Sequence, residues 1–194
     1  MNVLVLSDNK EILERAKPIF RKRTDVKYCF TNSDDINPKL DYQHILKTYQ
    51  LVFSLHCKKI FPPELINGVR CINIHPGFNP YNRGMYPHVW SIINRLPAGA
   101  TIHQMNEEID AGPMICQTQI KINAFDTSES LYERIVEEEL RLLNVYLNAL
   151  IDDQYSLTHL DKGNYNSLED YRGLCALNME KRGTFRHFYN ILRA

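Results

Sequence analysis

Short apolar runs alternate with amphipathic segments through the first half of the chain. Runs at 2–6, 26–30, 51–55 and 69–74 are rich in β-branched or aromatic residues and mostly apolar, as in strands buried on both faces. Helical spacing after the first run is carried by Ile12, Leu13, Ala16, Ile19 and Phe20. A strand, a helix and further strands in this order predict a parallel sheet.

The second half of the chain continues the alternation and ends in helices. The pattern predicts a helix at 87–94, strands at 100–105 and 114–122, and a polar surface segment at 155–173 that leads to a last helix at 184–193. A long helix after Thr127 has one apolar stripe, which consists of Leu131, Ile135, Leu142, Tyr146 and Leu150.

Two smaller features of that long helix are interpreted from the sequence. Asp126 and Glu129 have capping-box spacing before the stripe. The acidic run 137–139 is interpreted as the solvated side of the helix, with no role in a site. Together the elements predict an α/β, Rossmann-like fold with a mainly parallel sheet flanked by helices, followed by a short helical C-terminal part.

Composition and charge narrow the class of protein. The 194 residues are 44% hydrophobic, and 23 basic residues balance 23 acidic ones without a basic cluster, so nucleic acid is not the expected partner. The apolar stretches are shorter than the roughly 20 residues of a membrane-spanning helix. The N-terminus lacks the features of a signal peptide, and the five cysteines form no C-x-x-C pair. We therefore expect a cytoplasmic protein with reduced thiols and no membrane partner.

Several common chemistries lack their motifs. The turn at 7–10 has no glycines for a dinucleotide, and the chain contains neither a phosphate-binding G-x-x-x-x-G-K nor a G-x-S-x-G nucleophile elbow. A metal hydrolase is also disfavoured, because His56, His75, His88 and His103 do not have H-x-x-x-H spacing.

Candidate chemistry gathers where the fourth apolar run ends. Asn73 and His75 share one face of this strand, at the edge where α/β sheets bind ligands. The polar loop 79–84 follows directly, and the carboxylate-rich segment 107–113 joins two predicted strands. A carboxylate beside His75 would fix its tautomer and raise its proton affinity, although turn formation alone also explains an aspartate there.

The motifs N-I-H-P-G at 73–77, G-A-T-I-H at 99–103 and D-A-G-P at 110–113 resemble the formyltransferases that use N10-formyltetrahydrofolate. The resemblance implies Asn73, His75 and Asp110 as the catalytic set and N10-formyltetrahydrofolate as the formyl donor. Asn73 would donate to the oxyanion, and His75 would share that role or collect the amine proton. Asp110 would orient His75, and whether His75 or Asp110 first takes the proton stays open. His103 ranks below these three, as a packing histidine.

The loop 79–84 and the stretch 51–62 are most similar to the sugar N-formyltransferases. This resemblance implies a dTDP-linked amino-dideoxy sugar as acceptor, in surface polysaccharide (O-antigen) biosynthesis. The implied donor-binding residues are Ser54, Lys58, Ile60 and Phe61, with Lys59 as an alternative to Lys58. The candidates for the nucleotide-sugar side are Asn79, Tyr81, Asn82 and Arg83.

The resemblance also sets the expected organisation. Residues 1–150 form the catalytic domain, and 151–194 form a C-terminal extension shorter than in the sugar enzymes, where further residues support a homodimer. Two alternatives remain open. A formyltetrahydrofolate hydrolase would use the same three residues with water as acceptor, and a truncated protein would bind folate or nucleotide with little turnover.

Overall fold

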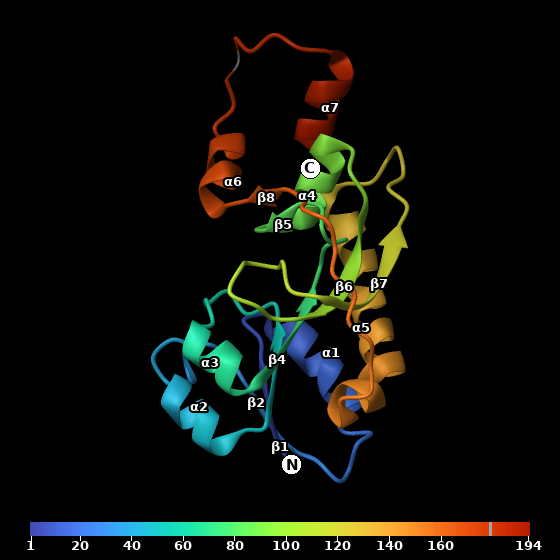
Figure 1. The fold of residues 1–194 in the computed structure, drawn as a ribbon. Helices are drawn as coiled ribbons and strands as arrows, with labels where there is room; N and C mark the ends of the chain where they lie inside the picture. Colours follow the sequence, from blue (N-terminus) through green and yellow to red (C-terminus); the bar gives the residue numbers. More distant parts are fainter. Residues whose placement is uncertain (179) are drawn as a thin grey trace.

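A computed structural model describes residues 1–178 and 180–194 (Figure 1). Its strands are β1 (Asn2–Leu6), β2 (Lys27–Thr31), β3 (Leu51–Leu55), β4 (Arg70–His75), β5 (Arg83–Gly84), β6 (Ala98–Gln104), β7 (Met114–Ile120) and β8 (Tyr165–Asn166). Its helices are α1 (Lys10–Phe20), α2 (Tyr42–Thr48), α3 (Pro63–Gly68), α4 (Pro87–Asn94), α5 (Ser128–Asp152), α6 (Leu168–Cys175) and α7 (Phe185–Arg193).

The six long strands form one sheet in the order β2-β1-β3-β4-β6-β7. The strands β1 to β4 are parallel, whereas β6 runs antiparallel to β4 and β7 antiparallel to β6. The predicted α/β fold with a mainly parallel sheet is therefore confirmed. The antiparallel register places His103 of β6 opposite Asn73 of β4.

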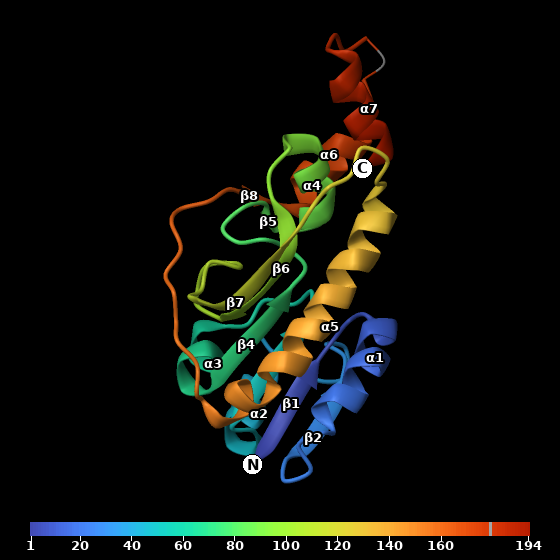
Figure 2. The ribbon, with the colours of Figure 1, turned by 90° about the vertical axis from the view of Figure 1, so that its right-hand side faces the viewer.

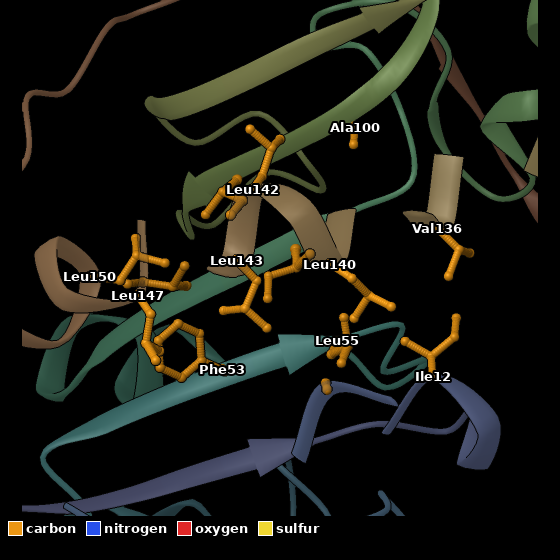
Figure 3. Close-up of a cluster of buried hydrophobic side chains, with 14 of the residues drawn as sticks. Ile12, Phe53, Leu55, Ala100, Val136, Leu140, Leu142, Leu143, Leu147 and Leu150 are labelled. Atoms are coloured by element: carbon orange, nitrogen blue, oxygen red, sulfur yellow. The ribbon is translucent and has the colours of Figure 1, made fainter. Parts of the chain in front are cut away.

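Alternate residues of the strands feed two separate cores, one on each face of the sheet. Val5, Phe53 and Ile74 belong to the larger core, which α1 and α5 cover (Figures 2 and 3). The intervening residues of the same strands pack beneath α2 and α3 on the opposite face. Burial on both faces explains why these runs are almost wholly apolar.

The long helix α5 differs from the sequence-based expectation in two details. Its N-cap is Thr127, whose side chain and Ser130 form the capping box, so the predicted box of Asp126 and Glu129 is wrong. Glu139 is fully buried, which corrects the interpretation of the acidic run as a solvated face. Consecutive residues of a helix lie about 100° apart, so three glutamates cannot share one side.

The segment after α5 is more structured than its polar sequence indicates. Most of 156–164 is exposed at the surface, as predicted, but β8 then pairs with β5 and α6 follows, capped by Ser167. The helices α2, α3 and α6 were not predicted because each buries at most one residue and so has no apolar stripe, whereas α4, with eight residues, buries four. The helices predicted at 87–94 and 184–193 are present as α4 and α7. Within the described residues, no helix has the length and apolar character needed to span a membrane.

Candidate active site

The functional side chains gather at the end of β4. Asn73 and His75 lie on the same face of this strand and are 9% and 4% exposed. Both line a cleft of about 730 Å³. They share a face because the side chains of a strand alternate with a period of two residues. They lie beside the cleft because α/β sheets of this kind bind ligands at the carboxyl ends of their parallel strands.

The loop between β6 and β7 returns Asp110 to this face. Asp110 has a left-handed backbone (φ 50°), an uncommon conformation for a residue with a side chain. Its Oδ1 accepts a hydrogen bond from Asn73 Nδ2 at 2.9 Å, and its Oδ2 accepts one from the Gly84 backbone N–H at 3.0 Å. Asn79 Nδ2 donates to the Asp110 carbonyl at 2.8 Å. The carboxylate is thus held from both oxygens.

His103 joins the group from the neighbouring strand. Its Nε2 lies 3.2 Å from Asn73 Nδ2 and 3.7 Å from Asp110 Oδ1. Its Nδ1 lies 3.1 Å from the carbonyl of Gln104, so Nδ1 carries the hydrogen and Nε2 accepts from Asn73. Both amide hydrogens of Asn73 are therefore engaged, one by Asp110 and one by His103. The sequence-based ranking treated His103 as a packing residue, but its ring contacts two members of the predicted catalytic set.

His75 has one ring nitrogen facing Asp110 and one without a protein partner. His75 Nδ1 lies 3.6 Å from Asp110 Oδ2, whereas its Nε2 is buried and has no hydrogen-bond partner among the described residues. A Cβ added to Gly77 would overlap with this nitrogen. A side chain at position 77 would therefore displace the His75 ring.

Burial and local contacts favour a neutral His75 and an ionised Asp110. Burial lowers the pKa of His75 to about 4, and the Asp110 carboxylate opposes this only in part. Burial also acts to raise the pKa of Asp110, but the proximity of His75, the contact with His103 and the Gly84 N–H lower it below its ordinary value. At neutral pH the site thus holds a neutral imidazole beside an ionised carboxylate.

The four residues predicted to bind the donor all line the same cleft. Ser54 lies on β3, and Lys58, Ile60 and Phe61 follow it on the connection to α3. Phe61 is buried in the smaller core, where Ile66 and Met105 also pack and line the cleft. The alternative residue Lys59 lines the cleft too, with Nζ 3.9 Å from Asp34.

The four residues predicted for the nucleotide-sugar side are placed differently. None of them is among the residues found to line the cleft in the described part of the chain. Asn79 and Asn82 are buried within the loop, and Asn82 binds Ser91, Asn94 and Asn164. Tyr81 is 37% exposed, and Arg83 Nη1 lies 3.9 Å from Glu108. The loop acts on the site through the backbone of Gly84 and through Asn79.

A polar part of the cleft was missed by the sequence analysis. It is lined by Asn9 at the start of α1, His56 after β3, His88 on α4 and Tyr132 on α5. His56 Nδ1 lies 3.0 Å from Tyr132 Oη, and the rings of His88 and Tyr132 are 4.9 Å apart. The one available indication was that His56 follows β3 as His75 ends β4, so both fall at the same edge of the sheet.

This arrangement suits group transfer to an amine. A neutral imidazole with a free nitrogen can accept a proton, an amide can donate to a developing oxyanion, and an ionised carboxylate can hold both in place. A mainly parallel α/β sheet with this Asn-His-Asp site at its edge defines a transferase of the formyl-transfer class.

Sequence comparison agrees with that class. The chain belongs to the formyl transferase family, whose pattern it matches over residues 2–147. It is 38% identical over 201 aligned residues to a dTDP-4-amino-4,6-dideoxyglucose formyltransferase of Mycobacterium tuberculosis, an alignment that spans 100% of this chain and 86% of that protein.

Solved structures show the same fold. A sugar N-formyltransferase from a Shewanella species superposes with a TM-score of 0.93 at 41% identity, covering 100% of this chain and 87% of that one. A formyltransferase from Anoxybacillus kamchatkensis, solved with a UDP-linked formamido sugar and tetrahydrofolate, shares the fold with a TM-score of 0.77 at 22% identity, covering 93% of each chain.

Proposed function

We propose that this protein transfers the formyl group of N10-formyltetrahydrofolate to the amino group of a dTDP-linked 4-amino-4,6-dideoxyglucose. The observation that carries the proposal is the unpartnered Nε2 of His75, held in a cleft beside Asn73 and Asp110. Full-length similarity to a formyltransferase named for this sugar supports the choice of acceptor.

The two ends of the cleft differ in a way that fits two substrates. Phe61, Ile66 and Met105 pack with the smaller core, beneath α2 and α3, and form an apolar wall that suits the flat ring system of a folate. Tyr132 packs against the larger core on the other face of the sheet, and His56 contacts Glu139 of α5. Ser54, Lys58 and Ile60 also line the cleft and are the further donor candidates. The polar end, with Asn9 and His56, suits an amino sugar.

His75 is the proposed proton acceptor. When bound, the donor supplies the formyl carbon that the amine attacks, and the new C–N bond requires the nitrogen to lose a proton. Both oxygens of Asp110 already accept hydrogen bonds, from Asn73 and from Gly84, whereas His75 Nε2 is free. His75 therefore takes the proton and returns it to the departing N10 nitrogen, and Asp110 stabilises the imidazolium that forms.

Asn73 is the proposed oxyanion donor. Its amide hydrogens bind Asp110 and His103, so a contact with the oxyanion requires one of them to be released. His103 is the partner we expect to lose, because a ring nitrogen is a weaker acceptor than the Asp110 carboxylate. The hydrogen bond to Asp110 then keeps the amide plane directed at the cleft.

The remaining parts of the proposal follow the same resemblance. Residues 1–150 form the catalytic domain of a cytoplasmic enzyme that formylates sugars for surface polysaccharides, and 151–194 form its extension. The family match over 2–147 supports this division.

Formyl transfer to dTDP-4-amino-4,6-dideoxyglucose, followed by product mass, tests the function. We expect formylated sugar from the wild type and a loss of about a hundredfold in turnover for His75→Ala. The exposed His159→Ala is the matched control and should retain wild-type turnover. A reaction without sugar runs in parallel and measures hydrolysis of the donor.

The outcomes separate the alternatives. Formate released equally well without sugar would identify a hydrolase, and donor binding without product would identify a binding protein with little turnover. Equal loss of activity in His75→Ala and His159→Ala would remove His75 from the mechanism.

A further inference from the structure

Glu139 is a buried carboxylate that the transfer mechanism does not use. It lies in the middle of α5 with no exposed surface. Both of its oxygens contact one nitrogen, His56 Nε2, at 3.0 and 2.8 Å. Burial raises the pKa of Glu139, and His56 opposes that change. A buried carboxylate is costly unless it is paired, so its presence beside a single histidine calls for a physical reason.

His56 connects this carboxylate to the cleft. It directly follows β3 with a left-handed backbone (φ 59°), and only 10% of its side chain is exposed. Its second ring nitrogen, Nδ1, lies 3.0 Å from the hydroxyl of Tyr132. Both nitrogens of the ring are therefore committed, one to the buried carboxylate and one to a tyrosine that lines the cleft.

Tyr132 is fixed from two further directions. Asn9 Nδ2 donates to its hydroxyl oxygen at 3.4 Å, while Asn9 Oδ1 caps α1 by accepting from the Ile12 N–H at 3.2 Å. The ring of His88 packs against the tyrosine ring at 4.9 Å. The hydroxyl thus ends a chain that runs from Glu139 through His56 to the cleft.

The number of protons shared by Glu139 and His56 decides whether the Tyr132 hydroxyl accepts or donates in its hydrogen bond with His56. A buried pair is least costly when its net charge is zero, which for Glu139 and His56 means two shared protons. His56 Nδ1 then carries a hydrogen whether the proton between the two groups sits on Nε2 or on the carboxyl group. Tyr132 Oη then accepts from both His56 and Asn9. Its own hydrogen then has no acceptor among Glu139, His56 and Asn9, which leaves it for a ligand in the cleft that Tyr132 lines.

We propose that Glu139 and His56 are positioning residues that hold the Tyr132 hydroxyl as a hydrogen-bond donor to an oxygen of the acceptor sugar. This inference rests on the proposed function. The acceptor is favoured over the donor as the ligand because Tyr132 lies with Asn9 and His56 at the polar end of the cleft, across from the apolar wall of Phe61, Ile66 and Met105.

Steady-state kinetics with each substrate varied separately test the inference. Tyr132→Phe keeps the ring that packs on His88, so it should fold normally. We expect it to raise the KM for the amino sugar about fivefold, the effect of one lost neutral hydrogen bond, while kcat and the donor KM change less than twofold. Tyr146→Phe, which removes a hydroxyl from the same helix, is the matched control.

A double-mutant cycle distinguishes positioning from general damage. Glu139→Gln should raise the sugar KM in the wild-type background but add nothing in the Tyr132→Phe background, because it acts through that hydroxyl. Glu137→Gln, at an exposed neighbour, is its control. If Glu139→Gln does not fold, His56→Asn replaces it in the cycle, since asparagine tolerates the left-handed backbone.

Each result decides the inference. A Tyr132→Phe variant with unchanged sugar KM overturns it, as does a Glu139→Gln or His56→Asn effect of equal size in both backgrounds. A fivefold rise confined to the sugar KM, with the non-additive cycle, supports it. A wild type that forms no formylated sugar counts against the proposed function itself, and the inference falls with it.

Discussion

Asn82 and Asn164 bind each other through a reciprocal pair of hydrogen bonds. The Asn82 backbone N–H donates to Asn164 Oδ1 at 2.9 Å, and Asn164 Nδ2 donates to Asn82 Oδ1 at 2.9 Å. This pair lies next to the pairing of β5 with β8, and Gly84 of β5 donates to the Asp110 carboxylate. Residues far apart in the sequence therefore jointly set the position of the predicted catalytic aspartate.

Replacement of Asn164 should weaken both folding and turnover. Asn164→Ala removes two hydrogen bonds from the buried Asn82 and leaves its backbone N–H unpaired, which we expect to lower the free energy of unfolding by about 1–3 kcal/mol. Loss of the Asn82–Asn164 pair also loosens Gly84, the backbone donor to Asp110. We therefore expect a larger fold-change in turnover than in the KM for the amino sugar. Urea unfolding and kinetics measure the two effects. The exposed Asn148→Ala on α5 should change neither, and an Asn164→Ala variant with wild-type turnover would contradict the link to Asp110.

Gly77→Ala should block the proton acceptor with little effect elsewhere. The added Cβ would overlap with Nε2 of His75, so the His75 ring must shift from its position. We expect turnover to fall at least about tenfold, because a small displacement of a reacting group is costly. At Gly173, by contrast, a Cβ would meet no atom within 4 Å. Assays of Gly173→Ala should give wild-type rates, and equal rates for the two variants would refute the proposed role of Nε2.

Asp110→Asn tests charge with little change in shape. The carboxylate accepts from Asn73 through one oxygen and from Gly84 through the other, but an amide has only one acceptor oxygen. One of these donors would therefore face an NH₂ group, and the imidazolium of His75 would lose its counter-charge. We expect turnover to drop about a hundredfold. The test measures kcat and the thermal unfolding midpoint of the variant side by side. A loss of kcat that is fully accounted for by unfolded protein would show that Asp110 has a structural role only.

Acid should destabilise the protein partly through His75. Burial lowers its pKa in the folded state to about 4, below the ordinary value of 6.5, so the unfolded chain takes up the proton first as pH falls. The stability that depends on neutral His75 is complete above pH 6.5 and is lost as pH falls toward 4, by up to about 3 kcal/mol.

Urea unfolding of the wild type and of His75→Gln between pH 7 and pH 4.5 checks this expectation. The variant should lose less stability across the range, since glutamine does not titrate. Contributions of Glu139 and His88 are common to both proteins and cancel in the comparison. Parallel curves for the two proteins would show that His75 is not the buried neutral histidine described above.

The sheet was predictable from the sequence because its strands are buried on both faces. Apolar runs placed β1, β3 and β4 to within a residue or two, and the polar ending of β4 drew attention to Asn73 and His75. The direction of β6 has no local pattern, since it depends on pairing with β4. Short helices such as α2 and α3 have too few turns to show a period.

The contacts of the site were less predictable than its location. Asn79 and Asn82 are polar residues of a loop beside the site, yet they bind the loop and the Asp110 backbone, a distinction that sequence cannot draw. Glu139 was hidden within a run of three glutamates. Its burial depends on the angle at which α5 meets the sheet, and so does its pairing with His56. The left-handed backbone of Asp110 likewise arises from tertiary contacts.

The pairing of β5 with β8 also orders events during synthesis. The last strand of the large sheet, β7, ends at Ile120, whereas β8 begins only at Tyr165. The ribosome therefore releases the whole large sheet and α5 before the strand that fixes Gly84 has emerged. All segments of the large sheet are thus available before the strand pairing that supports Gly84 can form. On the proposed mechanism, the residues Asn73, His75 and Asp110 are synthesised well ahead of the strand that supports their geometry.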